Sequence, residues 1–130
     1  MKLLLDTHIW LWGFLQPTRL SATVATELED PKNELWLSPI SLWELLILHK
    51  KKQLLAAQKF EEWLDKAFAI RPFREASLNF EVVREVSRLN LPHRDPADHF
   101  LVATAKVFGL TLVTADLNLQ RIPGLKVMKN

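Results

Sequence analysis

Short apolar runs alternate along the chain with longer segments of helical periodicity. Buried strands are predicted at residues 2–5, 34–37, 111–114 and 125–128. Helices are predicted at residues 7–15, 21 to about 30, 39 to about 50, 58–68, 75–89 and 97–108. A turn at 16–19 and a brief extended link at 70–73 join some of these elements.

The predicted helix ends carry recognisable signals. Ser21, Ser38 and Asp95 are good N-cap residues, and proline follows Ser38 and Asp95 at the first helical position. Gly109 is a typical stop for the last long helix.

Strands that are short and apolar, and that alternate with helices, favour a parallel sheet covered on both faces. We therefore expect an α/β fold: a three-layer α/β/α sandwich with a short, mostly parallel central sheet. The 130 residues, 48% hydrophobic and 25% charged, contain no repeat or linker, so residues 1–130 are expected to form a single domain.

Four acidic residues adjoin apolar segments in which a lone charge would be costly: Asp6, Glu44, Asp98 and Asp116. Taken singly, Asp6 could cap a helix, Asp98 could face a helix N-terminus and Asp116 could form an Asx turn. Glu44 has no such local use, because it lies in the middle of an apolar helix. In a parallel sheet the ligand crevice lies beyond the C-terminal strand ends, where Asp6 and Asp116 fall. If the fold gathers all four, each pair about 5 Å apart repels by roughly 3 kcal/mol, so the group must bind a cation or take up protons.

The chemistry of the candidate ligand atoms narrows the choice of cation. Oxygen ligands favour Mg²⁺ or Mn²⁺ over zinc, and the four histidines form no i,i+4 pair. The chain has no cysteine, which excludes disulfides and thiol-based sites. One or two hard cations held by carboxylates point to phosphodiester hydrolysis. A pI near 9.0 is compatible with a polyanionic substrate, although basic proteins that bind no nucleic acid are also common.

Four segments in order along the chain resemble PIN-domain nucleases of the VapC type, the ribonuclease toxins of toxin–antitoxin pairs. They are residues 3–8 (LLLDTH), 38–44 (SPISLWE), 93–98 (HRDPAD, continuing into LVATA) and 112–116 (LVTAD). Each motif alone is weak, but the four together span nearly the whole chain.

This resemblance implies that Asp6, Glu44, Asp98 and Asp116 bind one or two magnesium ions and cleave RNA, with Asp6 and Asp98 as the first ligands. Thr7 and Thr114 would supply hydroxyls that support these acids. Asp95 is interpreted as a better N-cap than ligand. His99 departs from the family pattern, which often has arginine after the third acid, so substrate binding there is expected to be weaker or pH-dependent.

Other protein classes fit less well. A haloacid-dehalogenase-type phosphatase needs a second aspartate where His8 stands, and a receiver domain needs a central phosphoacceptor aspartate and a later lysine that are not evident. A catalytically silent PIN scaffold that binds RNA or protein stays open as the alternative.

The sequence also gives expectations for binding partners and cellular location. Apolar faces around Trp10, Trp12 and Trp63 are expected to be covered by a second subunit, forming a homodimer, and by an antitoxin segment. The basic run at residues 49–52 fits a solvated helix end as well as an RNA contact. Asp6 and His8 interrupt the apolar N-terminus early, and no stretch is long enough to span a membrane, so a cytoplasmic protein is expected.

Overall fold

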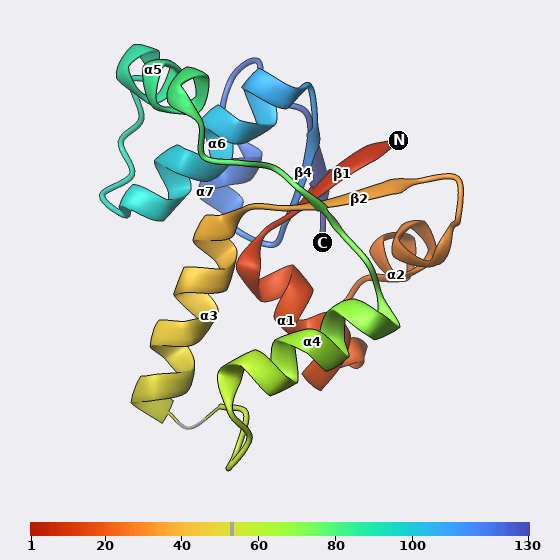
Figure 1. Cartoon of the computed structure of the whole chain (residues 1–130). Helices are drawn as coiled ribbons and strands as arrows, with labels where there is room; N and C mark the ends of the chain where they lie inside the picture. The colour runs from red at the N-terminus through yellow and green to blue at the C-terminus, as the bar shows by residue number, and fades with distance from the viewer. Residues whose placement is uncertain (53) are drawn as a thin grey trace.

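The computed structural model describes residues 1–52 and 54–130, which form a parallel sheet between two layers of helices (Figure 1). The strands are β1 (Lys2–Leu5), β2 (Glu34–Leu37), β3 (Arg74–Glu75), β4 (Thr111–Thr114) and β5 (Val127–Lys129). Their order across the sheet is β3-β2-β1-β4-β5, and every pairing in it is parallel. The predicted α/β class and three-layer arrangement are confirmed.

The helices cover both faces because successive residues of β1 point to opposite sides. Leu3 and Leu5 pack in one core cluster, whereas Leu4 packs in the other. The helices are α1 (Thr7–Leu15), the 3₁₀ turn η1 (Pro17–Arg19), α2 (Ala22–Glu29), α3 (Pro39–Lys52), α4 (Phe60–Ile70), α5 (Phe80–Arg88), α6 (Pro96–Phe108) and α7 (Leu117–Gln120). The first core cluster joins the sheet to α1, α2, α3 and α4, and the second joins it to α6 and α7.

The predicted helix signals operate as expected. The side chains of Ser21, Ser38 and Asp95 accept hydrogen bonds from the backbone N–H groups of the first helical turns, at 3.0 to 3.1 Å. Gly109 ends α6 with φ of 66°, a left-handed conformation that glycine adopts at little cost.

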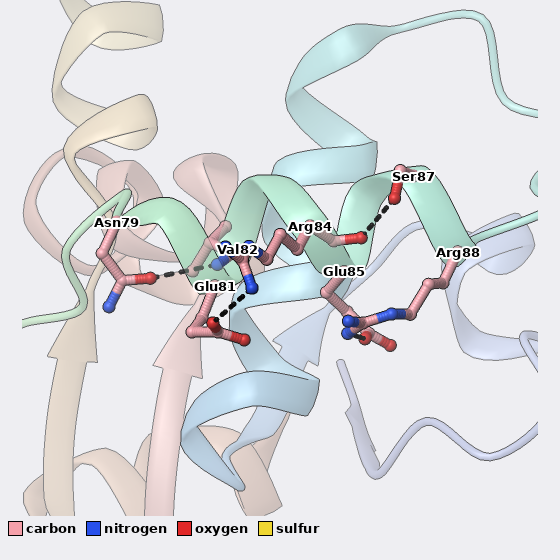
Figure 2. Close-up of polar contacts among 7 residues, drawn as sticks. All are labelled: Asn79, Glu81, Val82, Arg84, Glu85, Ser87 and Arg88. Atoms are coloured by element: carbon pink, nitrogen blue, oxygen red, sulfur yellow. Dashed lines mark hydrogen bonds and ion pairs between the residues drawn. The ribbon is translucent and has the colours of Figure 1, made fainter.

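The segment between α4 and α5 differs from the prediction. Residues 74–75 form an edge strand that pairs with Trp36 and Leu37, so the helix predicted at 75–89 begins only at Phe80. Asn79 then caps α5 by accepting from the Val82 N–H at 3.0 Å (Figure 2). Backbone pairing with β2 therefore keeps residues 74–75 in a strand rather than in a helix. The local sequence pattern gave no sign of this pairing, so it was not predicted.

Figure 2 also shows two ion pairs along α5. Glu81 pairs with Arg84 at 3.6 Å and Glu85 with Arg88 at 3.2 Å, both at i,i+3 spacing. Such exposed pairs contribute a few tenths of a kcal/mol each.

Two smaller elements also differ. The last strand is Val127–Lys129 rather than 125–128, and α7 was not predicted at all. No helix in the described part of the chain is long and apolar enough to cross a membrane.

The tryptophans correct one expectation. Trp10 and Trp63 are only 1% and 8% exposed, and their rings pack edge to face at 5.6 Å. They belong to the core of the single chain and are not free for a partner. Trp43 is instead the exposed tryptophan, at 57%.

Candidate metal centre

Asp6 and Asp116 lie where the chain crosses from one half of the sheet to the other. From the central strand β1 the chain runs outward to β2 and β3, and then returns to β4 on the opposite side of β1. Asp6 directly follows β1, and Asp116 lies two residues beyond the end of β4. The Asp6 N–H donates to the Val113 carbonyl at 3.0 Å, which holds the two strand ends together. Ligand crevices in parallel sheets form at such a crossing point.

The other two predicted acids reach the same place from helices. Glu44 lies on α3 and Asp98 in the first turn of α6. One cleft of about 450 Å³ is lined by all four acids together with Asp95, His8, Trp12, Arg19 and Ala115. The fold thus brings together every acid that the sequence singled out.

Two buried threonines orient these carboxylates. The Thr114 hydroxyl donates to Asp6 Oδ2 at 2.7 Å and accepts from the Asp116 N–H at 3.0 Å. The Thr7 hydroxyl donates to Glu44 Oε1 at 2.6 Å, joining α1 to α3. Both threonines are no more than 1% exposed, and their contacts with the acids agree with the expected supporting role.

Burial and mutual repulsion destabilise the charges of three acids. Burial raises the pKa of Asp6, against the hydrogen bond from Thr114. Burial also raises the pKa of Glu44, against the hydrogen bond from Thr7. Burial, followed by repulsion from Asp95, Asp116 and Asp6, raises the pKa of Asp98 to about 6.

Helix capping and turn formation, the local roles considered for single acids, are observed for only some of them. Asp116 does cap α7, accepting from the N–H groups of Asn118 and Leu119 at 2.8 and 3.3 Å, and Asp95 caps α6. Asp6 occupies the N-cap position of α1, but its side chain makes no capping hydrogen bond there. Its carboxylate is directed to Thr114 instead, so helix capping does not explain Asp6.

Sequence reasoning missed the cationic and aromatic wall of the cleft. His8 and Trp12 lie one helical turn apart on α1 with ring centroids 5.8 Å apart, and the Arg19 guanidinium lies 4.0 Å above the Trp12 ring. The i,i+4 spacing of His8 and Trp12 was an available signal, but the position of Arg19 depends on the turn after α1. His99 is not among the residues that line the cleft, and its Nε2 lies 2.6 Å from the His93 carbonyl oxygen.

The donor set fits a hard cation, although the side chains are not arranged as a finished ligand cage. Among the described residues, no group of three or more histidine, aspartate or glutamate side chains is placed so that it could hold a metal ion. The four acids nevertheless present only oxygen, and three of them are charged at a cost that a bound cation would relieve. A cation would therefore draw together carboxylates that repel one another in its absence.

Comparison with known proteins gives a consistent result. The family model for the PIN domain matches residues 3–125. Ribonuclease VapC22 of Mycobacterium tuberculosis (strain ATCC 25618 / H37Rv) is 31% identical over 120 residues, which cover 90% of this chain and 88% of that protein.

Solved structures of similar fold include VapBC2 from Rickettsia felis bound to a promoter DNA fragment, with a TM-score of 0.78 and 18% identity over 100% of this chain and 99% of that one. VapBC-1 from nontypeable Haemophilus influenzae has a TM-score of 0.67 and 18% identity over 99% and 98% of the two chains. A toxin–antitoxin complex from Klebsiella pneumoniae has a TM-score of 0.65 and 23% identity over 97% and 95%. At these identities the structures support the fold alone.

Proposed function

We propose, on the premise that this chain belongs to the PIN-domain family, that it is a VapC-type ribonuclease that hydrolyses RNA phosphodiester bonds with the help of a divalent cation. The observation that carries the proposal is the single cleft in which four separate parts of the chain place Asp6, Glu44, Asp98 and Asp116. No local structural need explains why Glu44 and Asp6 should be charged and half-buried there.

Asp6 and Asp98 are the first candidates to hold one or two Mg²⁺ or Mn²⁺ ions, with Glu44 and Asp116 completing the set. Such a cation supplies Lewis-acid stabilisation of the negative charge that develops on a phosphodiester during hydrolysis. Thr114 and Thr7 each donate a hydrogen bond to one oxygen of Asp6 and of Glu44, respectively, which restricts how these carboxylates can turn within the cleft.

The wall of the cleft formed by His8, Trp12 and Arg19 is suited to contact the phosphates of an RNA backbone. His8 and Arg19 are exposed side chains beside the acids, and Arg19 forms no ion pair within the described residues. Arg19 could therefore contact an RNA phosphate without first breaking a protein ion pair. Trp12 holds the guanidinium in place from below.

The relatives support a proposal for the biological role. VapC22 is named a ribonuclease, and several proteins of similar fold were solved as toxin–antitoxin complexes. We infer that this chain is the toxin of such a pair, acts in the cytoplasm, forms a homodimer and is held inactive by a cognate antitoxin. The surface that the partners cover is not formed by Trp10 or Trp63, which are buried in the core.

The test is cleavage of a total RNA preparation by purified protein, with Mg²⁺, Mn²⁺ or an excess of chelator. Cleavage should need the cation, and Asp6→Asn should lower the rate by about 100-fold or more, because it removes the ligand charge at nearly constant volume. Asp65→Asn is the matched control, since Asp65 is an exposed residue of α4 outside the cleft.

Undiminished cleavage in chelator would refute the metal mechanism. RNA binding that tolerates chelator, without any cleavage under any condition, would instead favour the silent scaffold. Co-expression with the neighbouring reading frame, followed by measurement of mass and growth, tests the toxin role separately.

A further inference from the structure

A second pocket lies next to the acidic cleft, between the loop before α6 and the segment that contains α7. Its volume is about 420 Å³, within the range of small-ligand sites. Its principal lining residues are Asn90, Leu91, His93, Asn118, Arg121 and Ile122, accompanied by two prolines.

A backbone hydrogen bond connects the wall of this pocket to one of the site acids. The Asn118 N–H donates to Asp116 Oδ1 at 2.8 Å, so the segment that lines the pocket is fixed to one of the site acids. On the other wall, His93 is close enough to Asp98 that its charge affects the pKa of that acid, and the carbonyl of His93 contacts His99. A ligand in this pocket would lie beside the acidic cleft rather than at a remote surface.

The chemistry of the lining differs from that of the acidic cleft. None of the lining residues is acidic, and Arg121 forms no ion pair among the described residues. Leu91 and Ile122 supply apolar walls, while Asn90, Asn118 and Arg121 supply amide and guanidinium groups. Apolar walls with a few hydrogen-bonding groups are usual for a small-ligand site, and a nucleobase offers both an apolar face and a hydrogen-bonding edge.

His93 adds a specific observation. Both ring nitrogens are buried, and neither has a hydrogen-bond partner in the part of the chain that the structure describes. Leaving a buried polar group unpaired is unfavourable, so a ligand that reaches and pairs with this ring would gain from the contact. His93 is also one of the residues that line the pocket.

We propose that this pocket binds the purine base of a nucleotide adjacent to the scissile phosphate and thereby sets the sequence preference of cleavage. Arg121 and the two asparagines match the hydrogen-bonding edge of a purine, since arginine pairs in bidentate fashion with guanine and asparagine with adenine. The inference rests on the proposed ribonuclease function, because only then does an RNA chain occupy the neighbouring cleft.

The binding experiment uses the full chain in chelator, so that neither catalysis nor a cation in the acidic cleft contributes. The probes are the 5′-monophosphates of adenosine, guanosine, cytidine and uridine, titrated while the imidazole NMR signals of the protein are followed. A purine nucleotide should bind at least about tenfold more tightly than either pyrimidine nucleotide, as one bidentate base contact implies. The His93 signals should shift, whereas those of His49, which accepts from the Leu55 N–H elsewhere, should not.

Two variants test whether the purine nucleotide binds in this pocket. Arg121→Ala should weaken purine binding about tenfold, and Ile122→Trp, which fills the pocket, should abolish it. Arg84→Ala is the control, because Arg84 is an exposed arginine of α5 outside the pocket (Figure 2). Circular dichroism and thermal unfolding check that each variant is folded, and Arg121→Ala, at an exposed position, keeps the test informative if Ile122→Trp does not fold.

The cleavage experiment then compares RNA substrates that differ at single positions. Arg121→Ala should flatten the base preference of the cut sites while metal dependence remains. Absence of purine binding, equal binding of all four nucleotides, or binding without a shift of His93 would overturn the pocket assignment even if the protein cleaves RNA. Purine binding at His93 by a protein that cannot cleave RNA would instead leave the pocket standing and refute the ribonuclease proposal.

Discussion

Removing the charge of Asp98 should stabilise the protein when no cation is present. Burial and the neighbouring carboxylates of Asp95, Asp116 and Asp6 raise the pKa of Asp98 from 3.8 to about 6. The folded state therefore binds a proton more tightly than the unfolded state does, so the free energy of unfolding falls as pH rises from about 3.8 through about 6 and is constant above. Asp98→Asn should remove this loss of stability, because asparagine does not ionise.

The magnitude follows from the size of the pKa change. A rise from 3.8 to about 6 corresponds to about 3 kcal/mol if it is expressed in full. Asp98 is only half-buried, so solvent screens part of the interaction, and we expect a gain of about 1–2 kcal/mol at pH 7.5. For a chain of 130 residues this is a rise in Tm of roughly 4–8 °C.

The assay is denaturant unfolding in chelator at pH 7.5 and again near pH 4. Asp98→Asn should be more stable than the parent at pH 7.5 and nearly equal to it near pH 4, where the parent carboxyl is protonated in the folded protein. The control Asp65→Asn should show no such difference between the two pH values. Saturating Mg²⁺ should reverse the order at pH 7.5, because the parent gains about 2.7 kcal/mol at a hundredfold excess over Kd.

Two results would refute this reasoning. An Asp98→Asn variant that is less stable than its parent in chelator at pH 7.5 would show that the charge is already compensated within the protein. A stabilisation of equal size at pH 4 would show that its cause is not ionisation.

Three further outcomes are expected. Asp95→Ala should lower the free energy of unfolding by about 1 kcal/mol in chemical denaturation, because Asp95 caps α6, whereas Asp95→Asn keeps the cap and most of the stability. If Asp95→Ala instead abolishes cleavage at unchanged stability, Asp95 is a ligand. Thr114→Val should cost about 1–3 kcal/mol and slow cleavage, since it removes the hydroxyl between Asp6 and Asp116, and Thr114→Ser should restore most of both. Thr7→Val should raise the pKa of Glu44 further, shifting the acid limb of the pH–rate profile upward; an unmoved profile would deny Glu44 a part in the reaction.

The sequence predicted those parts of the fold whose causes are local. The runs at 2–5, 34–37 and 111–114 became strands with the predicted bounds, because each is short, largely apolar and lies between segments of helical periodicity. The strand at 74–75 could not be predicted, since arginine and glutamate have no strand pattern and are held by pairing with β2. Its existence depends on where another part of the chain lies.

The acidic site was predictable because charge in an apolar context is unusual wherever it occurs. Asp6 and Glu44 stood out by that rule, and the structure places them in one cleft with Asp98 and Asp116. The cation–aromatic wall was not predictable in the same way. Arg19 is an ordinary exposed residue in sequence, and its role depends on a turn that folds it back over Trp12.

The tryptophans show why apolar patterning alone does not locate a partner surface. Trp10 and Trp63 lie on separate helices, and each helix by itself presents an apolar face that needs cover. The fold supplies that cover by packing the two rings against each other, so no second chain is required at that point. A partner must instead be sought where large apolar side chains stay exposed after folding, as at Trp43 on α3 and Phe80 on α5, which are 57% and 85% exposed. Trp43 adjoins Glu44 in the chain, so a partner segment bound there would lie next to the residue whose carboxylate faces the acidic cleft.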